Sequence, residues 1–292
     1  MKSLVRKLLG TVVRSDAVYL LIDRTLGRTV DFLRARRQAL MTEREGFDRQ
    51  AWWFDEFTFE QLPRVFPTRE VVGGPFAGLR YPELMAFGST LFPKLLGSYE
   101  FELHGVIADC RTSDYSLIVD VGCAEGYYAI GLACCLPASR VIAVDIDPAA
   151  LEQCRRMAEL NDVSERLELK GSLGSEELSK LASGSDRMLV FSDCEGFEDA
   201  LFDSATLKAL ERHDLVIETH DAHDPLLSTR VRERAEQTHD VTVISSVDDL
   251  RRPVRFPCEE LSAFTLLERV RLMAEKRKQS MDWLVCRARR DR

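Results

Sequence analysis

Apolar and polar positions change their pattern near residue 115 of this chain. From there on, short and nearly continuous apolar runs alternate with amphipathic segments. The apolar runs predict seven strands, over residues 116–122, 140–147, 166–172, 187–193, 214–220, 240–247 and 281–288. The segments between them predict helices over residues 127–136, 176–181, 198–213, 226–237 and 261–276, and a further helix that begins at Pro148. Buried strands that alternate with helices indicate an α/β fold with a doubly wound, mostly parallel seven-stranded sheet.

The chain before this alternation has a different pattern. Residues 1–95 are mostly helical in pattern, with aromatic, proline and glycine interruptions, and we predict an N-terminal helical region there as a candidate substrate lid or anchor. The remainder, 96–292, is the predicted cofactor-binding domain. A cluster of five aromatic residues in this region could close over a substrate, although packing inside the helical region is the favoured interpretation. Its members are Trp52, Trp53, Phe54, Phe57 and Phe59.

Charge is distributed unevenly along the sequence. The whole chain carries a formal net charge of −8, and residues 1–40 hold nine Lys or Arg against three Asp or Glu. The rest is therefore strongly acidic, which argues against a broad nucleic-acid-binding surface, because phosphate contacts need clustered cations. Within the basic start, Val5, Leu8, Leu9 and Val12 share one helical face. Packing on the protein is the favoured interpretation, and peripheral membrane contact is the alternative.

The eight cysteines include no C-x-x-C pair. Cys134 and Cys135 lie in an apolar helical run, which predicts buried free thiols of the kind found in a reducing cytosol. A cytoplasmic protein, with membrane association as the alternative, is therefore expected.

A glycine-containing turn follows the first predicted strand. Gly122 and Gly126 allow the backbone to turn sharply and to approach a ligand closely. A dinucleotide fingerprint needs a further glycine where Ala124 stands. Asp120 and Glu125 would repel a pyrophosphate, but they suit a ligand with an ammonium group, such as the methionine end of S-adenosylmethionine. A turn of this kind without any ligand is the alternative.

The second predicted strand supports an adenosine ligand. Asp145 lies near its end, 23 residues after the first glycine of the turn, where an acidic residue accepts hydrogen bonds from ribose hydroxyls. An acid at a helix N-terminus is the alternative, and Asp147 fits that role better because a proline follows it. Ile146 and Ser172 are further candidate cofactor contacts, and Ser172 would lie on the adenine side.

Several runs of residues now resemble a known group, the class I S-adenosylmethionine-dependent methyltransferases of the FkbM type. These runs are D-V-G-C-A-E-G-Y-Y at 120–128, V-D-I-D-P at 144–148, D-C-E-G-F-E at 193–198, I-E-T-H at 217–220 and G-S-Y-E at 97–100. The resemblance covers roughly residues 95–290. It implies S-adenosyl-L-methionine as cofactor, an antiparallel final strand, and O-methylation of a hydroxyl on a sugar, polyketide or other small metabolite. Tyr99 and Glu100 could close over that cofactor.

Methylation of a hydroxyl would benefit from a general base, since a neutral hydroxyl is a weak nucleophile. The candidates at the predicted carboxyl edge of the sheet are Asp193, Glu195, Glu198, His220, Asp221 and His223. Glu195 is the first choice, with a cap or cofactor-positioning role as its alternative. His220 has a suitable ordinary pKa, although a structural role is favoured for it. Asp193 is also a candidate cofactor contact.

Other interpretations remain open at this point. The run 220–224 could join Asp193 in binding a divalent metal, but its spacing matches no closed site, so a solvated loop is favoured and no metal is predicted. The acceptor could instead be a nitrogen or a protein. A cofactor-binding interaction module without catalysis is the rival from another class. The sequence leaves the oligomeric state open.

Overall fold

A computed structural model describes residues 55–289 except 222–223 and 278–279. The predictions that concern Val5–Val12, Trp52–Phe54 and His223 lie outside the described residues. Among the residues described, no helix combines the length and the apolar character that crossing a bilayer requires.

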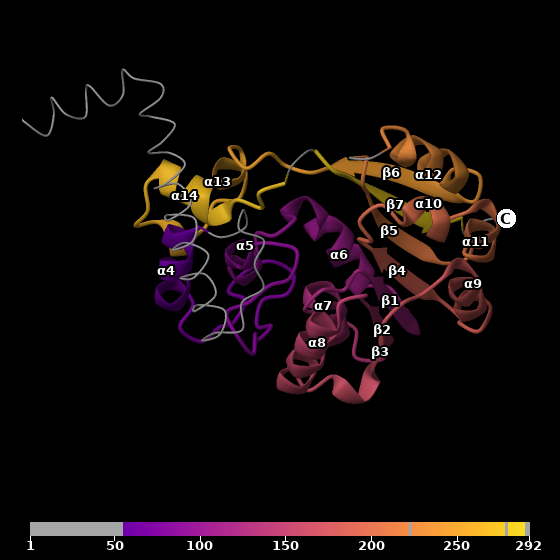
Figure 1. The fold of residues 1–292 in the computed structure, drawn as a ribbon, viewed down its shortest axis with the longest axis horizontal. Coiled ribbons are helices and arrows are strands. Elements are labelled where there is room, and N and C mark those ends of the chain that lie inside the picture. The colour runs from indigo at the N-terminus through magenta and orange to yellow at the C-terminus, as the bar shows by residue number, and fades with distance from the viewer. Residues whose placement is uncertain (1–54, 222–223, 278–279, 290–292) are drawn as a thin grey trace, which may run out of the picture. The chain divides into compact units, whose positions relative to one another are not determined.

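The sheet has seven strands in the order β3-β2-β1-β4-β5-β7-β6 (Figure 1). The strands are β1 Leu117–Val121, β2 Arg140–Val144, β3 Leu167–Lys170, β4 Met188–Ser192, β5 Asp214–Thr219, β6 His239–Ser245 and β7 Asp282–Ala288. Strands β1 to β5 pair in parallel, and β7 is antiparallel to both β5 and β6. This confirms the predicted fold class, including the antiparallel final strand. The chain order reverses beside β1, so the carboxyl ends of β1, β2 and β4 flank the position where such sheets bind ligands.

Helices cover both faces of this sheet (Figure 1). The α-helices of the described residues, including those that do not lie on the sheet, are α4 Glu56–Val65, α5 Leu91–Leu96, α6 His104–Arg111, α7 Tyr127–Cys135, α8 Pro148–Leu160, α9 Ser175–Ser183, α10 Glu198–Leu201, α11 Ser204–Ala209, α12 Leu227–Ala235, α13 Arg252–Arg255 and α14 Leu266–Met273. Neighbouring residues of β1 alternate between the two apolar layers. Ile118 packs in one layer with α7 and α8, and Val119 packs in the other with α9, α11 and α12.

Two predicted helices differ from those observed. The segment 198–213 forms two helices, because Asp203 accepts a hydrogen bond from the Thr206 amide and so caps α11 from an extended backbone (φ −69°, ψ 171°). The segment 261–276 is helical only over α14, which begins at a capping box between Thr265 and Glu268. In both places a side chain that caps a helix sets the boundary.

The prediction for the paired cysteines was wrong in part. Cys134 is exposed and Cys135 is half-buried. Both lie in the last turn of α7, whose buried contacts are made by Ile130 and Ala133 instead. The thiols of Cys123 and Cys154, which lie near the glycine turn, are buried and free.

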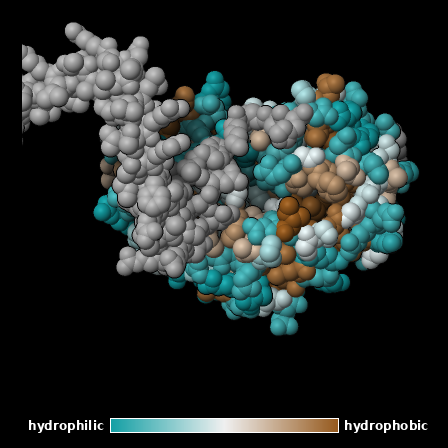
Figure 2. Space-filling model, in the orientation of Figure 1, coloured by the Kyte–Doolittle hydropathy of each residue, from teal (hydrophilic) through white to brown (hydrophobic). Residues whose placement is uncertain are grey.

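Residues from the described part of the N-terminal region pack into the same layer as the sheet. Leu62 and Leu91 belong to the cluster that contains Ile118, and Phe57 and Phe59 pack against it half-buried. These two phenylalanines thus have the core role favoured for them. The face drawn in Figure 2 is mostly hydrophilic where residues are described, with smaller hydrophobic groups between.

Candidate functional site

The turn between β1 and α7 is built from left-handed backbone. Gly122, Ala124 and Gly126 have φ values of 83°, 48° and 99°. A Cβ on Gly122 would lie 1.6 Å from the carbonyl oxygen of Asp193, and one on Gly126 would lie 2.8 Å from the sulfur of Cys154. The two glycines are therefore required by the close packing of the turn against β4 and α8. Ala124 adopts a conformation that costs an L-residue about 1–2 kcal/mol.

Asp145 directs its carboxylate at this turn, as predicted. Its Oδ2 accepts a hydrogen bond from the Ala124 amide at 2.8 Å, and its Oδ1 accepts one from the Asp147 amide at 2.8 Å. Each carboxylate oxygen has a further lone pair that can accept a hydrogen bond from a ligand hydroxyl. Asp147 caps α8 through the Ala149 amide, so the helix-terminus role belongs to Asp147.

An exposed apolar residue follows this carboxylate. Ile146 is 88% exposed, the highest value among the large hydrophobic side chains described. A flat ring lying on Ile146 would remove that apolar surface from water. Ser172, after β3, is also exposed, so its predicted contact on the adenine side remains open to a ligand.

Asp120 is a buried acid within β1. It is 2% exposed, and its Oδ2 has no hydrogen-bond partner in the described part of the chain. Burial raises the pKa of Asp120 to about 8, against a backbone hydrogen bond at Ala129 that lowers it. An ammonium group would give this carboxylate the positive partner that it lacks.

Glu125 has partners that the sequence did not predict. Its carboxylate forms an ion pair with Lys94 at 2.6 Å, and it accepts hydrogen bonds from the Tyr81 hydroxyl at 3.2 Å and the Phe87 amide at 2.9 Å. These contacts occupy the carboxylate. The structure therefore gives Glu125 the task of holding the segment 81–94 against the turn, in place of the predicted contact with a ligand ammonium.

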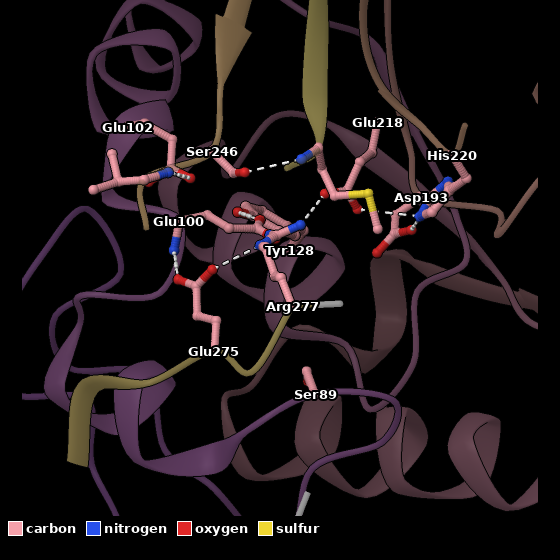
Figure 3. A network of polar contacts seen from close by, with 12 residues as sticks. Ser89, Glu100, Glu102, Tyr128, Asp193, Glu218, His220, Ser246, Glu275 and Arg277 are labelled. Carbon is pink, nitrogen blue, oxygen red and sulfur yellow. Dashed lines mark hydrogen bonds and ion pairs between the residues drawn. The ribbon is translucent and has the colours of Figure 1, made fainter. Parts of the chain in front are cut away.

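A second polar cluster lies at the carboxyl ends of β4 and β5. Nδ1 of His220 is 2.6 Å from Glu198, and its Nε2 is 3.3 Å from Oδ1 of Asp193 and 3.8 Å from Glu195. Figure 3 shows Asp193 and His220 facing one another. Glu195 and Gly196 form the tight turn after β4, with φ values of 53° and 101°. The structure thus brings together all three predicted catalytic residues.

The pKa values of His220 and Asp193 indicate which groups of this cluster can act as the general base. Burial alone would lower the pKa of His220, but the close contacts with Asp193 and Glu198 raise it to about 11. Contact with His220 lowers the pKa of Asp193 against the effect of burial. In this state the imidazole is charged and Asp193 is ionised, so the carboxylates are the groups able to accept a proton.

The remaining base candidates have structural partners. Glu198 is fully buried against His220. Asp221 accepts hydrogen bonds from the amide and the hydroxyl of Ser228 at 2.8 and 2.6 Å. Asp224 pairs with Arg230 at 2.6 Å, so the described members of the run, His220, Asp221 and Asp224, have separate partners.

Arg277 joins the second cluster to a buried ionic network that the sequence did not reveal. Its guanidinium contacts Glu100, Glu218 and Glu275, the last at 2.9 Å (Figure 3). Arg252, fully buried, also pairs with Glu275, at 2.6 Å. Burial raises the pKa values of Glu100, Glu218 and Glu275, with Arg277 acting in the opposite direction.

Glu100, a predicted cofactor contact, therefore lies in this network, where it also accepts a hydrogen bond from the Tyr128 hydroxyl. Tyr99 beside it packs edge-on against Tyr127 at 5.5 Å between ring centres, which is ordinary core packing. One signal could have indicated Glu218, because it is a charged residue directly after the apolar run 215–217 of β5. No comparable signal marks Arg277.

Comparison with known families matches residues 118–212 to a family model described as a methyltransferase domain. The match spans the glycine turn, Asp145 and Asp193. It supports the predicted methyltransferase domain, for which S-adenosylmethionine is the predicted cofactor. The family model is not specific for the FkbM type, so membership of that family stays a prediction.

Curated relatives share part of the chain. The ribosomal protein L11 methyltransferase of Pectobacterium atrosepticum is 33% identical over 129 residues, 43% of this chain and 41% of that protein. The protein of the same name from Serratia proteamaculans is 52% identical over 129 residues, 43% of this chain and 42% of that one. The chain thus spans about two fifths of the length of these relatives. Among solved structures, the O-methyltransferase TomG from Streptomyces achromogenes is 16% identical, with a TM-score of 0.41, over 80% of this chain and 91% of that one.

Proposed function

We propose that this chain transfers a methyl group from S-adenosylmethionine to a hydroxyl of a small acceptor, such as a sugar or polyketide. The observation that carries the proposal is the position of Asp145. Its carboxylate lies against the glycine turn and keeps lone pairs for two ligand hydroxyls. A ribose diol is the group that suits it.

The other cofactor contacts follow from this anchor. With the ribose on Asp145, the adenine would cover exposed Ile146 and approach Ser172. The methionine end would extend toward β1, where the unpartnered oxygen of Asp120 can receive its ammonium group. The cofactor would thus lie across the carboxyl ends of β1 and β2.

The acceptor would lie beside the cofactor, at the carboxyl ends of β4 and β5. Methyl transfer is an in-line displacement, in which a carbon–oxygen bond forms while the carbon–sulfur bond breaks, and alignment supplies much of the rate. The hydroxyl proton would pass to a carboxylate. Glu195 suits this role because its side chain is 81% exposed on a tight turn, and Asp193 lies next to it, 32% exposed. The by-product is S-adenosylhomocysteine.

A nitrogen acceptor, on a small molecule or a protein, is the second candidate. One observation favours it: the three buried glutamates around Arg277 outnumber the two arginines that pair with them, which favours a cationic group nearby. The curated relatives are named for methylation of a ribosomal protein. Assays on paired acceptors that carry either a hydroxyl or an amine on the same skeleton would separate the two candidates.

Calorimetric titration with S-adenosylhomocysteine tests the proposed cofactor site. Asp145→Ala removes charge-assisted hydrogen bonds to the ribose, so we expect affinity to fall about 10–100-fold. Asp147→Ala is the matched control. It removes the neighbouring carboxylate and the α8 cap, which costs about 1 kcal/mol of stability, yet it should keep the affinity.

Two results would overturn the proposal. One is binding of a nicotinamide dinucleotide in place of S-adenosylhomocysteine, and the other is an unchanged affinity in Asp145→Ala. Tight cofactor binding without methyl transfer to any hydroxyl or amine acceptor would support the rival interpretation, a non-catalytic binding module.

A further inference from the structure

Three carboxylates surround one nitrogen of a buried histidine. Nε2 of His220 lies 3.3 Å from Oδ1 of Asp193, 3.6 Å from Oε2 of Glu218 and 3.8 Å from Oε2 of Glu195. One ligand atom from each of Asp193, Glu195 and His220 lies within 4.8 Å of the other two. The group comes from the ends of β4 and β5, two adjacent parallel strands (Figure 3).

These separations suit a shared ion. Oxygen and nitrogen ligands held about 2.1 Å from one small divalent cation lie roughly 3–4.2 Å apart. Both distances from Nε2 to Asp193 and Glu195 fall inside that range. The donors therefore need only small side-chain adjustments to share one ion.

The histidine is also oriented as metal-binding histidines are. Its Nδ1 is held at 2.6 Å by Glu198, which is fully buried on α10. A carboxylate on one ring nitrogen fixes the ring and directs the other nitrogen at the metal. Glu198 is thus a positioning residue for Nε2.

A second observation concerns the charge around this nitrogen. Oδ1 of Asp193 is buried, and it lies 3.3 Å from Nε2 without forming a hydrogen bond of good geometry with a described residue. Glu218 is 2% exposed and directs one oxygen at Nε2, while its other oxygen pairs with Arg277. Buried carboxylates this close together need positive charge between them, which the His220 imidazolium supplies in the metal-free protein and a divalent cation could supply in place of its proton.

We propose that Asp193, Glu195 and His220 bind one divalent transition-metal cation, with Glu218 beside them. Carboxylate oxygens combined with one imidazole suit ions such as Mn²⁺, Fe²⁺ or Zn²⁺. The site differs from the run 220–224 considered from the sequence, since it uses Glu195 and leaves out Asp221. In the proposed reaction, the ion would bind the acceptor oxygen and lower the pKa of its hydroxyl, and the proton would pass to the oxygen of Glu195 that does not bind the ion. That role rests on the proposed function, whereas binding of the ion does not.

Titration of the full-length, cofactor-free protein with Mn²⁺, followed by electron paramagnetic resonance, tests the site. We expect saturable binding of one ion, weakened at least tenfold in Glu195→Gln. Glu195 is exposed, so this change should leave the fold intact. Glu233→Gln, an equal loss of charge on the exposed face of α12, is the matched control and should bind as the unmodified protein does.

Pulsed resonance adds a signature that a merely structural cluster would not give. A ¹⁴N coupling from the imidazole should appear with bound Mn²⁺ and disappear in His220→Asn. Absence of saturable binding, equal binding in Glu195→Gln, or bound Mn²⁺ without the nitrogen coupling would each overturn the proposal. Parallel titration with S-adenosylhomocysteine separates the two proposals, because cofactor binding without Mn²⁺ binding contradicts only the metal site.

Discussion

The two halves of the candidate site are held together differently. The cofactor half consists of the turn 122–126 and Asp145. Apart from the buried ion pair of Glu125 with Lys94, its contacts are mostly hydrogen bonds to backbone amides. The acceptor half consists of the turn 193–198, the end of β5 and the network around Arg277. Its contacts are ion pairs between side chains from distant segments.

The two halves should therefore differ in how much stability a substitution costs. Asp145 is half-buried, so water can reach the two amides that are left when its carboxylate is removed, and we expect the cost in stability to be small. The acceptor half buries charges that neutralise one another, so removal of one partner leaves the others uncompensated. We therefore expect substitutions in the cofactor half to change affinity, and substitutions in the acceptor half to change stability as well.

The largest expected effect comes from Arg277→Ala. It leaves Glu100, Glu218 and Glu275 without their shared cation, and loss of one partner of a buried ion pair costs about 3–5 kcal/mol. Chemical denaturation should show the unfolding free energy falling by that amount. The matched control is Arg155→Ala, which breaks exposed pairs with Glu152 and Glu159 and should cost less than about 1 kcal/mol. Equal losses in the two variants would contradict the contrast between buried and exposed pairs.

A smaller loss of stability is expected for Gly122→Ala, at the point where the glycine turn contacts the end of β4. Gly122→Ala would place a Cβ 1.6 Å from the Asp193 carbonyl oxygen at a φ of 83°, so one backbone must shift. Overpacking and left-handed strain together predict a loss of about 2–4 kcal/mol by chemical denaturation. Gly171→Ala meets no atom within 4 Å and should change stability by less than about 1 kcal/mol. If Gly122→Ala is as stable as Gly171→Ala, the close approach of β1 and β4 is not as described.

The smallest effect should come from Ala124→Gly. Ala124 has a φ of 48°, which costs about 1–2 kcal/mol, and glycine removes this strain but adds about 0.4–1 kcal/mol of unfolded-state entropy. The net expectation is a gain of about 0–1.6 kcal/mol, seen as an unchanged or slightly higher melting temperature, with unchanged affinity for S-adenosylhomocysteine. A lower melting temperature would contradict the strained turn.

The contrast between local backbone contacts and ion pairs of distant residues also explains which features could be predicted from the sequence. The seven strands, their mostly parallel arrangement and the place of Asp145 at the end of the second strand depend on local patterns and on the geometry that parallel sheets share, so all three could be predicted. The antiparallel β7 was expected only from the resemblance to a known family. Helix boundaries failed where a single capping side chain, such as that of Asp203, decided them.

Long-range ion pairs account for most of the rest. Arg277 meets Glu218 across 59 positions and Glu100 across 177, separations that leave no periodic signal. Glu125 is separated by 31 positions from Lys94, so its sequence context could not show that the lysine would occupy it. Side chains of this kind are placed by the whole fold.

A crystal structure of the protein with bound S-adenosylhomocysteine would test the central claim most directly. The account predicts both ribose hydroxyls within hydrogen-bond distance of Asp145, the adenine over Ile146 and the ammonium group beside Asp120. A ligand bound elsewhere on the sheet, or a ribose that makes no contact with Asp145, would contradict it.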